Sequence, residues 1–213
     1  MGIILGIIGF FKAGGLFMFP IMLILAIGTA IIIERFKFLK RTWTDGNVLW
    51  AKLEESIKSK RIDDAIRECS LSDAALPKVL AAGLEKAKTV KLNRDSREEL
   101  ENHLEEAMLD VIPQLERRTH YLPTLANVST LLGLLGTIIG LIQSFQSIAV
   151  ADPSQKAFLL AQGVSVAMNT TAFGLIVAIP IMLCYSYIQS RTIKTVDALD
   201  AYSIKLVNLL TSE

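Results

Sequence analysis

The sequence is poor in the residues that enzymes use for catalysis and for metal binding. Among its 213 residues are two histidines, His103 and His120, and two cysteines, Cys69 and Cys184. Neither cysteine has a metal-ligand neighbour at a typical spacing, and one lies in a polar section while the other lies in an apolar one, so no disulfide is expected. A membrane enzyme that uses His103 or His120 stays open only as a minor alternative.

The sequence also lacks a net charge of either sign. It has 22 lysines and arginines against 21 aspartates and glutamates, which gives a formal net charge of +1. Binding to nucleic acid requires a clear excess of basic residues on one face, so nucleic acid is not expected as a partner. The stretch "GLLGTIIG" is not a phosphate-binding loop either, because no lysine followed by serine or threonine comes after it.

Charge is absent altogether from three long segments. These uncharged segments run from Leu16 to Ile33, from Tyr121 to Ala151 and from Ala157 to Ser190. A helix needs ~20 residues to cross a hydrocarbon core of ~30 Å, and a helix is the form that satisfies its own backbone groups in lipid. We predict an all-α membrane protein with three transmembrane helices, at 16–36, 121–150 and 157–190.

Basic residues flank the three segments on a common side. "ERFKFLKR" follows the first segment, "ERRTH" precedes the second, and Arg191 with Lys194 follows the third. The positive-inside rule assigns this side to the cytoplasm. The short, turn-like stretch at 151–156 joins the second and third segments into an antiparallel hairpin, so it is expected to be a periplasmic loop. The N-terminus is then periplasmic and the C-terminus cytoplasmic.

Most charged residues lie between the first and second segments, in a predicted cytoplasmic helical domain at 37–120. Apolar residues recur there at three- and four-residue spacing, which indicates helices. A last helix is expected to begin at a capping box of Ser96 and Glu99 and to run directly into the second transmembrane helix, bending at Pro113 and Pro123.

The two ends of the chain and the long helices complete this arrangement. Residues 1–15 are apolar but too short to cross, so we expect a helix in the outer membrane interface. Residues 191–213 are expected to form a cytoplasmic C-terminal helix. Long extensions of the second and third transmembrane helices then contribute to the cytoplasmic domain.

Small residues recur every three or four positions in two of the segments. They include Gly133, Gly136 and Gly140 in the second segment, and Gly163 and Gly174 in the third. Such stripes let transmembrane helices approach closely, so we interpret these glycines as helix-packing residues.

Neutral polar side chains also lie within these uncharged segments. Asn169, Thr170 and Thr171 are consecutive in the third, and hydroxyls recur every seven residues in the second, at Thr130, Thr137 and Ser144. Hydroxyls in membrane helices often bond to their own backbone. Facing a partner helix in register, they could instead line a polar path for a cation or a water chain. Both readings stay open at this point.

Two stretches resemble a known family. "LLGLLGTIIGLIQSFQSIA" at 131–149 and "GVSVAMNTTAFGLIVAIPIMLCYS" at 163–186 resemble the second and third spans of the ExbB/TolQ/MotA family of ion-driven inner-membrane motors. The ExbB/TolQ branch fits best, because MotA proteins usually have four spans. The resemblance implies a multi-pass subunit of the bacterial inner membrane that couples ion flow to mechanical work and needs no cofactor besides the transported ion.

The resemblance also implies partners and pathway residues. Five copies would surround two copies of an ExbD/TolR-like single-span protein, whose membrane aspartate carries the ion. Thr137 and Thr171 match the threonines that line the path, and Asn169 and Thr170 are expected to tune it, although helix packing stays open for Thr170.

One position departs from the family pattern. Relatives typically have a glutamate five residues before the second threonine, and this position is Val166 here. A proton relay through a carboxylate of this chain's own spans is therefore excluded. Protons are the expected coupling ion, with sodium as the alternative. The alternative function is a membrane scaffold that binds other transmembrane helices without conducting ions.

Overall fold

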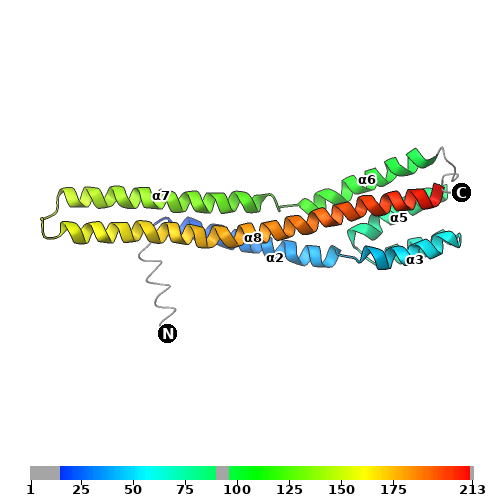
Figure 1. The fold of residues 1–213 in the computed structure, drawn as a ribbon, viewed down its shortest axis with the longest axis horizontal. Helices are drawn as coiled ribbons and strands as arrows, with labels where there is room; N and C mark the ends of the chain where they lie inside the picture. The colour runs from blue at the N-terminus through cyan, green and yellow to red at the C-terminus, as the bar shows by residue number, and fades with distance from the viewer. Residues whose placement is uncertain (1–14, 90–95, 212–213) are drawn as a thin grey trace, which may run out of the picture. The chain divides into compact units, whose positions relative to one another are not determined.

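The computed structural model describes residues 15–89 and 96–211, and the secondary structure of these residues is entirely helical (Figure 1). Three long helical segments, which contain α2, α7 and α8, are apolar enough to cross a membrane. The predicted all-α fold class is confirmed. The expected helix at 1–15 lies outside the described residues except for Gly15. The helices are α2 (Met18–Thr42), α3 (Gly46–Lys58), α4 (Ile62–Ser70), α5 (Ala75–Thr89), α6 (Arg97–Glu116), α7 (Tyr121–Ala149) and α8 (Lys156–Thr211).

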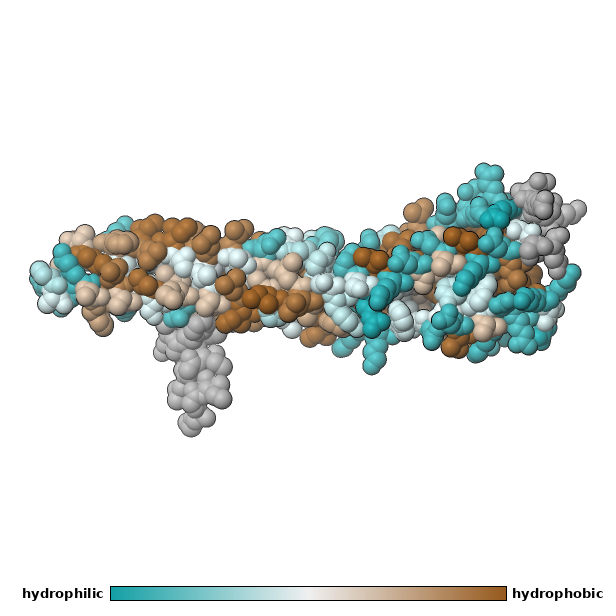
Figure 2. Space-filling model, viewed as in Figure 1, coloured by the Kyte–Doolittle hydropathy of each residue, from teal (hydrophilic) through white to brown (hydrophobic). Residues whose placement is uncertain are grey.

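The chain divides by its internal contacts into two compact units. The first unit comprises residues 1–33 and 118–186, and the second unit comprises residues 34–117 and 187–213. Hydrophobic side chains cover much of α7 and of the first half of α8, whereas hydrophilic side chains cover much of α3 to α6 (Figure 2). The first unit therefore has the surface of a membrane domain, and the second unit has the surface of a domain in water.

In the first unit, α7 and the first half of α8 run antiparallel (Figure 1). The connecting turn contains a hydrogen bond of 2.9 Å from the Gln155 amide to the Asp152 carbonyl, so the two helices are joined by a tight turn. Helix α2 contacts α8 at Gly28, where an added Cβ would lie 2.8 Å from the end of the Ile181 side chain. Gly15 adopts a φ of +74° just before α2, a conformation that favours glycine.

The second unit has a conventional aliphatic core. Helices α3, α4 and α5 lie where apolar periodicity predicts helices, and leucines from several helices are buried together. Gly83 on α5 lets Leu104 and Leu206 approach its backbone. Burying such side chains from water provides ~1.5–3 kcal/mol each, which stabilises a unit in water. The most deeply buried leucines of this unit are Leu53, Leu80, Leu84, Leu100, Leu104, Leu115, Leu199 and Leu206.

Helix α6 does not run directly into α7, so this prediction is wrong. Helix α6 ends at Glu116, Arg118 has a φ of 61°, and α7 begins at Tyr121. The Nη2 atom of Arg35 donates to the carbonyls of Gln114 and Leu115 at 3.2 and 2.8 Å. A buried arginine thus binds last-turn carbonyls that would otherwise accept N–H groups of a continuing helix.

The predicted capping box at the start of α6 is also wrong. Ser96 occupies the N-cap position, but its side chain makes no capping hydrogen bond. The Glu99 carboxylate instead lies 2.7 Å from the Lys86 ammonium on α5. An ion pair with a neighbouring helix has replaced the local bond that the sequence pattern suggested.

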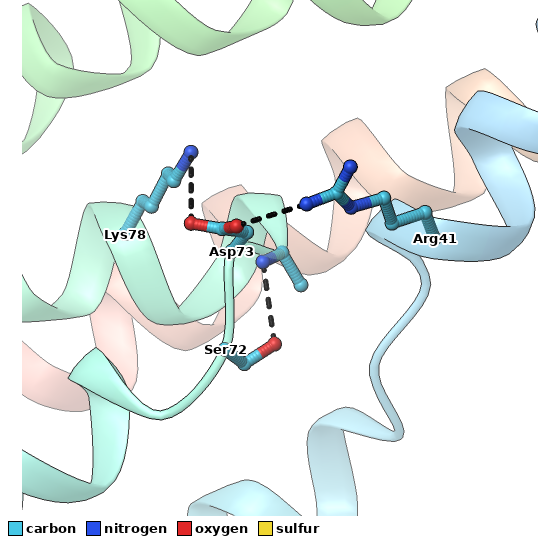
Figure 3. Close-up of polar contacts among 5 residues, drawn as sticks. Arg41, Ser72, Asp73 and Lys78 are labelled. Carbon is cyan, nitrogen blue, oxygen red and sulfur yellow. Dashed lines mark hydrogen bonds and ion pairs between the residues drawn. The ribbon is translucent and has the colours of Figure 1, made fainter.

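A charged cluster lies where the end of α2 meets the start of α5, within the second unit (Figure 3). The Asp73 carboxylate lies 3.2 Å from Arg41 and 3.9 Å from Lys78, and the Ser72 hydroxyl accepts from the Ala74 amide. The charged side chains are largely exposed, so each pair contributes only ~0–1 kcal/mol. The cluster nevertheless pairs the guanidinium of Arg41 with a carboxylate.

Candidate functional site

The candidate site is the contact between α7 and the first half of α8, which is made of small residues. An added Cβ at Gly133 would lie 3.2 Å from the Thr171 Cα, and one at Gly174 would lie 2.8 Å from the Ser129 carbonyl oxygen. At Gly140, an added Cβ would lie 3.2 Å from the Ala167 Cβ. The two backbones therefore approach closely along what we call the glycine contact, formed by Gly133, Gly136, Gly140, Ala167, Thr170 and Gly174.

Two of the hydroxyl side chains fill space within this contact. Thr170 is only 1% exposed, donates to the Val166 carbonyl at 3.0 Å, and occupies the space beside Gly136. The Ser144 side chain occupies the space that a side chain at Gly163 would need. The structure thus places Thr170 in helix packing, which is the role that the sequence left open for it.

Two other hydroxyls join the helices directly. Ser129 on α7 donates to the Gly174 carbonyl at 3.0 Å, and Thr171 on α8 donates to the Gly133 carbonyl at 2.9 Å. The sequence analysis named Thr171 as a pathway residue, whereas Ser129 was not among the expected site residues. The signal that could have identified Ser129 is a hydroxyl within a stripe of glycines and alanines, where a short side chain can reach the facing backbone.

The Gly133 carbonyl relates Thr171 on α8 to the turn of α7 that contains Thr137. In an α-helix the carbonyl of residue 133 accepts the N–H of residue 137, and α7 is continuous across both positions. The Thr171 hydroxyl donates to the same oxygen. The Thr171 hydroxyl therefore lies one helical turn from Thr137, whose own hydroxyl bonds to the Leu134 carbonyl.

The hydroxyl protons of both threonines are already engaged. Thr137 donates to the Leu134 carbonyl at 2.5 Å, and Thr171 donates across the contact. A hydroxyl has one donor and two acceptor lone pairs, so each oxygen keeps lone pairs for other groups. Fixed neutral oxygens of this kind can coordinate a cation or accept hydrogen bonds from water or hydronium.

Asn169 lies on the opposite edge of α8 from Thr171. Successive helical residues are about 100° apart, so Asn169 and Thr171 flank the buried Thr170 on opposite sides. Asn169 is half-buried, and over residues 15–89 and 96–211 its amide has no hydrogen-bond partner. The structure therefore places Thr171 one helical turn from Thr137 and separates Asn169 from them.

The seven-residue series of hydroxyls on α7 does not share one environment. Thr130 is exposed, Thr137 is half-buried and Ser144 is buried against α8. An α-helix drifts by ~20° per seven residues, so positions in such a series turn gradually toward the neighbouring helix. The three hydroxyls therefore do not all face α8 in register, which was one of the two readings left open by the sequence.

The residues considered for catalysis lie apart from any reactive cluster in the part of the chain that the structure describes. His103 lies 3.5 Å from Glu106 on α6, and the His120 ring packs against Tyr121. No group of three potential metal ligands occurs among the described residues. Burial raises the pKa of the Cys69 thiol to about 11, so this cysteine is a poor nucleophile at neutral pH.

Comparison with known proteins identifies relatives that match most of this chain. Residues 71–201 match the profile of the MotA/TolQ/ExbB proton channel family. An ExbB homologue from Methanothermobacter thermautotrophicus is 28% identical over 192 residues, which are 89% of this chain and 65% of that protein. An ExbB-like protein from Synechocystis is 29% identical over 92% of this chain and 76% of its own length. TolQ of Haemophilus influenzae is 35% identical over 40% of this chain and 37% of its own.

The family match covers more than half of the chain and includes both helices of the glycine contact. The chain belongs to the MotA/TolQ/ExbB proton channel family. It is therefore a multi-pass membrane protein of a family whose members are channels and not enzymes.

Proposed function

We propose that this chain conducts the coupling ion past the edge of the glycine contact and thereby drives mechanical work through a partner protein. The observation that carries the proposal is the Thr171 hydroxyl, which bonds across the contact to the Gly133 carbonyl one helical turn before Thr137. Both hydroxyls have their protons engaged and keep lone pairs for an ion or water. Asn169 acts from the other edge of α8, and Thr170 supports the pathway by packing.

The titrating group comes from another chain under this proposal. The three uncharged segments contain no acidic residue, and Val166 stands where relatives typically carry glutamate. We infer an ExbD/TolR-like single-span partner whose membrane aspartate carries the ion. Family membership supports such a partner. The ion is a proton, with sodium as the alternative, because neutral oxygens without a carboxylate suit either a water chain or a sodium ion.

The proposed assembly has five copies of this chain around two partner copies in a bacterial inner membrane. The spans are 16–36, 121–150 and 157–190, and the hairpin at 151–156 faces the periplasm. The domain at 37–120 and the helix at 191–213 lie in the cytoplasm, and residues 1–15 lie in the outer interface. Labelling of single cysteines tests this topology, because Ser154→Cys should react with an impermeant reagent in intact cells and Ser72→Cys only after permeabilisation.

Ion flux tests the proposed function. The full chain is expressed from its own locus, purified with any neighbouring partner, and reconstituted into vesicles with a proton or sodium gradient. Thr171→Val and Thr137→Val should abolish the flux, because valine keeps the shape of threonine and removes the oxygen. Normal flux in both variants would overturn the pathway assignment.

Ser129→Ala is the matched control for Thr171→Val. Both variants remove one hydroxyl-to-carbonyl hydrogen bond between α7 and α8, but Ser129 bonds to Gly174 and not to Gly133. If the chain were only a scaffold, both variants should weaken assembly to a similar degree and no flux should appear. A channel instead predicts intact flux in Ser129→Ala, with both variants assembling equally well by native mass spectrometry.

A further inference from the structure

A cavity of about 430 Å³ opens in the second unit between the end of α2 and the adjoining part of α8. Three cationic side chains line it, Lys37 and Lys40 from α2 and Arg191 from α8. The remaining lining is mainly aromatic and apolar, and it contains no acidic residue. It consists of Phe36, Leu39, Trp43, Tyr187 and Thr195.

Aromatic side chains hold the guanidinium of Arg191 in place. Its Nε donates to the Tyr187 hydroxyl at 3.2 Å, and its central carbon lies 5.2 Å from the centre of the Trp43 ring. Phe36 and Tyr187 stack with ring centres 5.4 Å apart. The terminal NH₂ groups of Arg191 remain as paired donors, which is the geometry that recognises phosphate oxygens.

The three cations of the cavity have no carboxylate partner within residues 15–89 and 96–211. Arg41 on the same helix differs, because the Asp73 carboxylate binds it (Figure 3). The cavity therefore keeps an uncompensated positive charge while a neighbouring cation is neutralised. A ligand that complements it must carry negative charge.

The cavity residues lie where the uncharged parts of α2 and α8 end. Lys37 and Lys40 follow Ile33, the last residue of the first uncharged segment, by ~6 and ~10 Å along the helix axis. Arg191 directly follows Ser190, the last residue of the third. Trp43 and Tyr187 are half exposed. Exposed tryptophan and tyrosine beside basic residues are typical of the level of lipid headgroups.

We propose that this cavity binds the phosphate headgroup of an anionic phospholipid from the leaflet at which α2 and α8 leave the membrane. Arg191 binds the phosphate through its terminal NH₂ groups, and Lys37 and Lys40 bind as point charges. The lipid's acyl chains extend along the apolar side of α2. The proposal needs only that these helices cross the membrane, so it stands or falls independently of ion conduction.

Fluorescence of Trp43 provides a direct test. The chain has two tryptophans, so Trp50→Phe leaves Trp43 as the single reporter. The full chain is reconstituted in phosphatidylcholine vesicles with a minor fraction of brominated phosphatidylglycerol or brominated phosphatidylcholine. Brominated phosphatidylglycerol should quench Trp43 more strongly than its bulk fraction predicts. Each removed cation should lower this preference about fivefold, in Arg191→Gln and in Lys37→Gln.

Lys194→Gln is the matched control. Lys194 lies three residues from Arg191 on the exposed surface of α8 and does not line the cavity. Lys194→Gln removes one positive charge at nearly the same distance from the membrane as Arg191→Gln. It should keep the preference for phosphatidylglycerol. Equal losses in Lys194→Gln and Arg191→Gln would overturn the site, because they would indicate only a diffuse surface potential.

Two further results would overturn the proposal. Quenching that shows no preference between the two lipids would mean that the cavity is empty or is filled by another protein segment. A response of Trp43 fluorescence to millimolar inorganic phosphate, in vesicles that show no preference for brominated phosphatidylglycerol, would mean that free phosphate, not lipid, is the ligand. Native mass spectrometry of the otherwise unmodified chain provides an independent readout, with retained phosphatidylglycerol expected in the wild type and in Lys194→Gln but reduced in Arg191→Gln.

Discussion

The two units of this protein pack their helices by opposite means. In the first unit, α7 and α8 meet through glycine, alanine and hydroxyl side chains, and their bulky aliphatic residues, such as Leu134 and Ile176, point outward. In the second unit, large leucines fill the interior and charged residues cover the outside. This difference in packing follows from the solvent around each unit. Water drives leucines inward, whereas lipid gives no such drive and leaves close backbone approach and hydrogen bonds to join helices.

Leu84→Ala should give the largest loss of stability, because it acts where water supplies the driving force. Leu84 is fully buried in the second unit, and its truncation should cost ~2–5 kcal/mol of unfolding free energy. Urea unfolding of the full chain in detergent, followed by circular dichroism, measures this change. Leu109→Ala removes the same atoms from an exposed position on α6 and should cost far less. Equal costs would contradict the assignment of this core.

Cys69 measures how well the same core excludes water. Burial raises the pKa of its thiol from 9.0 to about 11, so at pH 8 its thiolate fraction, and its labelling rate, should be about a hundredfold below those of an ordinary cysteine. Because the folded state holds this proton more tightly, its stability should also fall as the pH rises from about 9 to about 11. The Cys184→Ala background isolates Cys69.

The control for Cys69 is its exposed neighbour. Ser70→Cys with Cys69→Ala, in the same background, places a thiol one residue along α4 and outside the core. This thiol should label at the rate of a free cysteine. Equal rates at both positions would mean that water reaches the core.

Gly174→Ala tests the other packing mode. Its added methyl group would lie 2.8 Å from the backbone oxygen of Ser129, which cannot move aside as a side chain can. The expected cost is ~1–3 kcal/mol, measured as a lower melting temperature in detergent. Gly140→Ala is the milder counterpart, since its new methyl group would lie 3.2 Å from the Ala167 methyl. A larger loss of melting temperature in Gly140→Ala than in Gly174→Ala would contradict the assignment of the glycine contact.

Glu54→Gln should have the smallest effect. The hydrogen bond from Lys58 lowers the pKa of the Glu54 carboxyl below 4.5, and the side chain is partly exposed. A lowered pKa contributes stability above the unfolded value, which is lost as the pH falls through the folded value. The variant should match the wild type at neutral pH and show slightly less acid dependence below pH 4.5. A clear loss at neutral pH would show that this surface pair matters more than its exposure suggests.

The sequence predicted the features that depend on long, regular patterns. Uncharged segments, apolar periodicity and the short turn at 151–156 each repeat one physical signal over many residues, and the structure contains the corresponding helices and hairpin. The family pattern also picked out Thr137 and Thr171, and in the structure the Thr171 hydroxyl bonds to the carbonyl of Gly133, one helical turn before Thr137. Their role in conduction stays a prediction.

Features set by single contacts between distant residues were missed. The break after α6 depends on Arg35, which lies 80 residues from the Leu115 carbonyl that it binds. The capping box at Ser96 failed because Lys86 on another helix attracts Glu99. Asn169 was grouped with Thr171 because the two are near in sequence, although a helix turns neighbours two residues apart to opposite sides. Local patterns contain no information about such partners.

The shared acceptor at Gly133 makes that peptide group an optical reporter. A carbonyl that accepts both the helical N–H and the Thr171 hydroxyl has a weakened C=O bond, so its infrared stretching band should lie at lower frequency than those of its neighbours in α7. Isotope labelling of this one carbonyl would separate the band from the rest. If a cation coordinates the Thr171 oxygen during transport, the hydroxyl becomes a stronger donor to Gly133, so the band should shift further downward in step with the flux. The pathway could then be observed without changing a single residue.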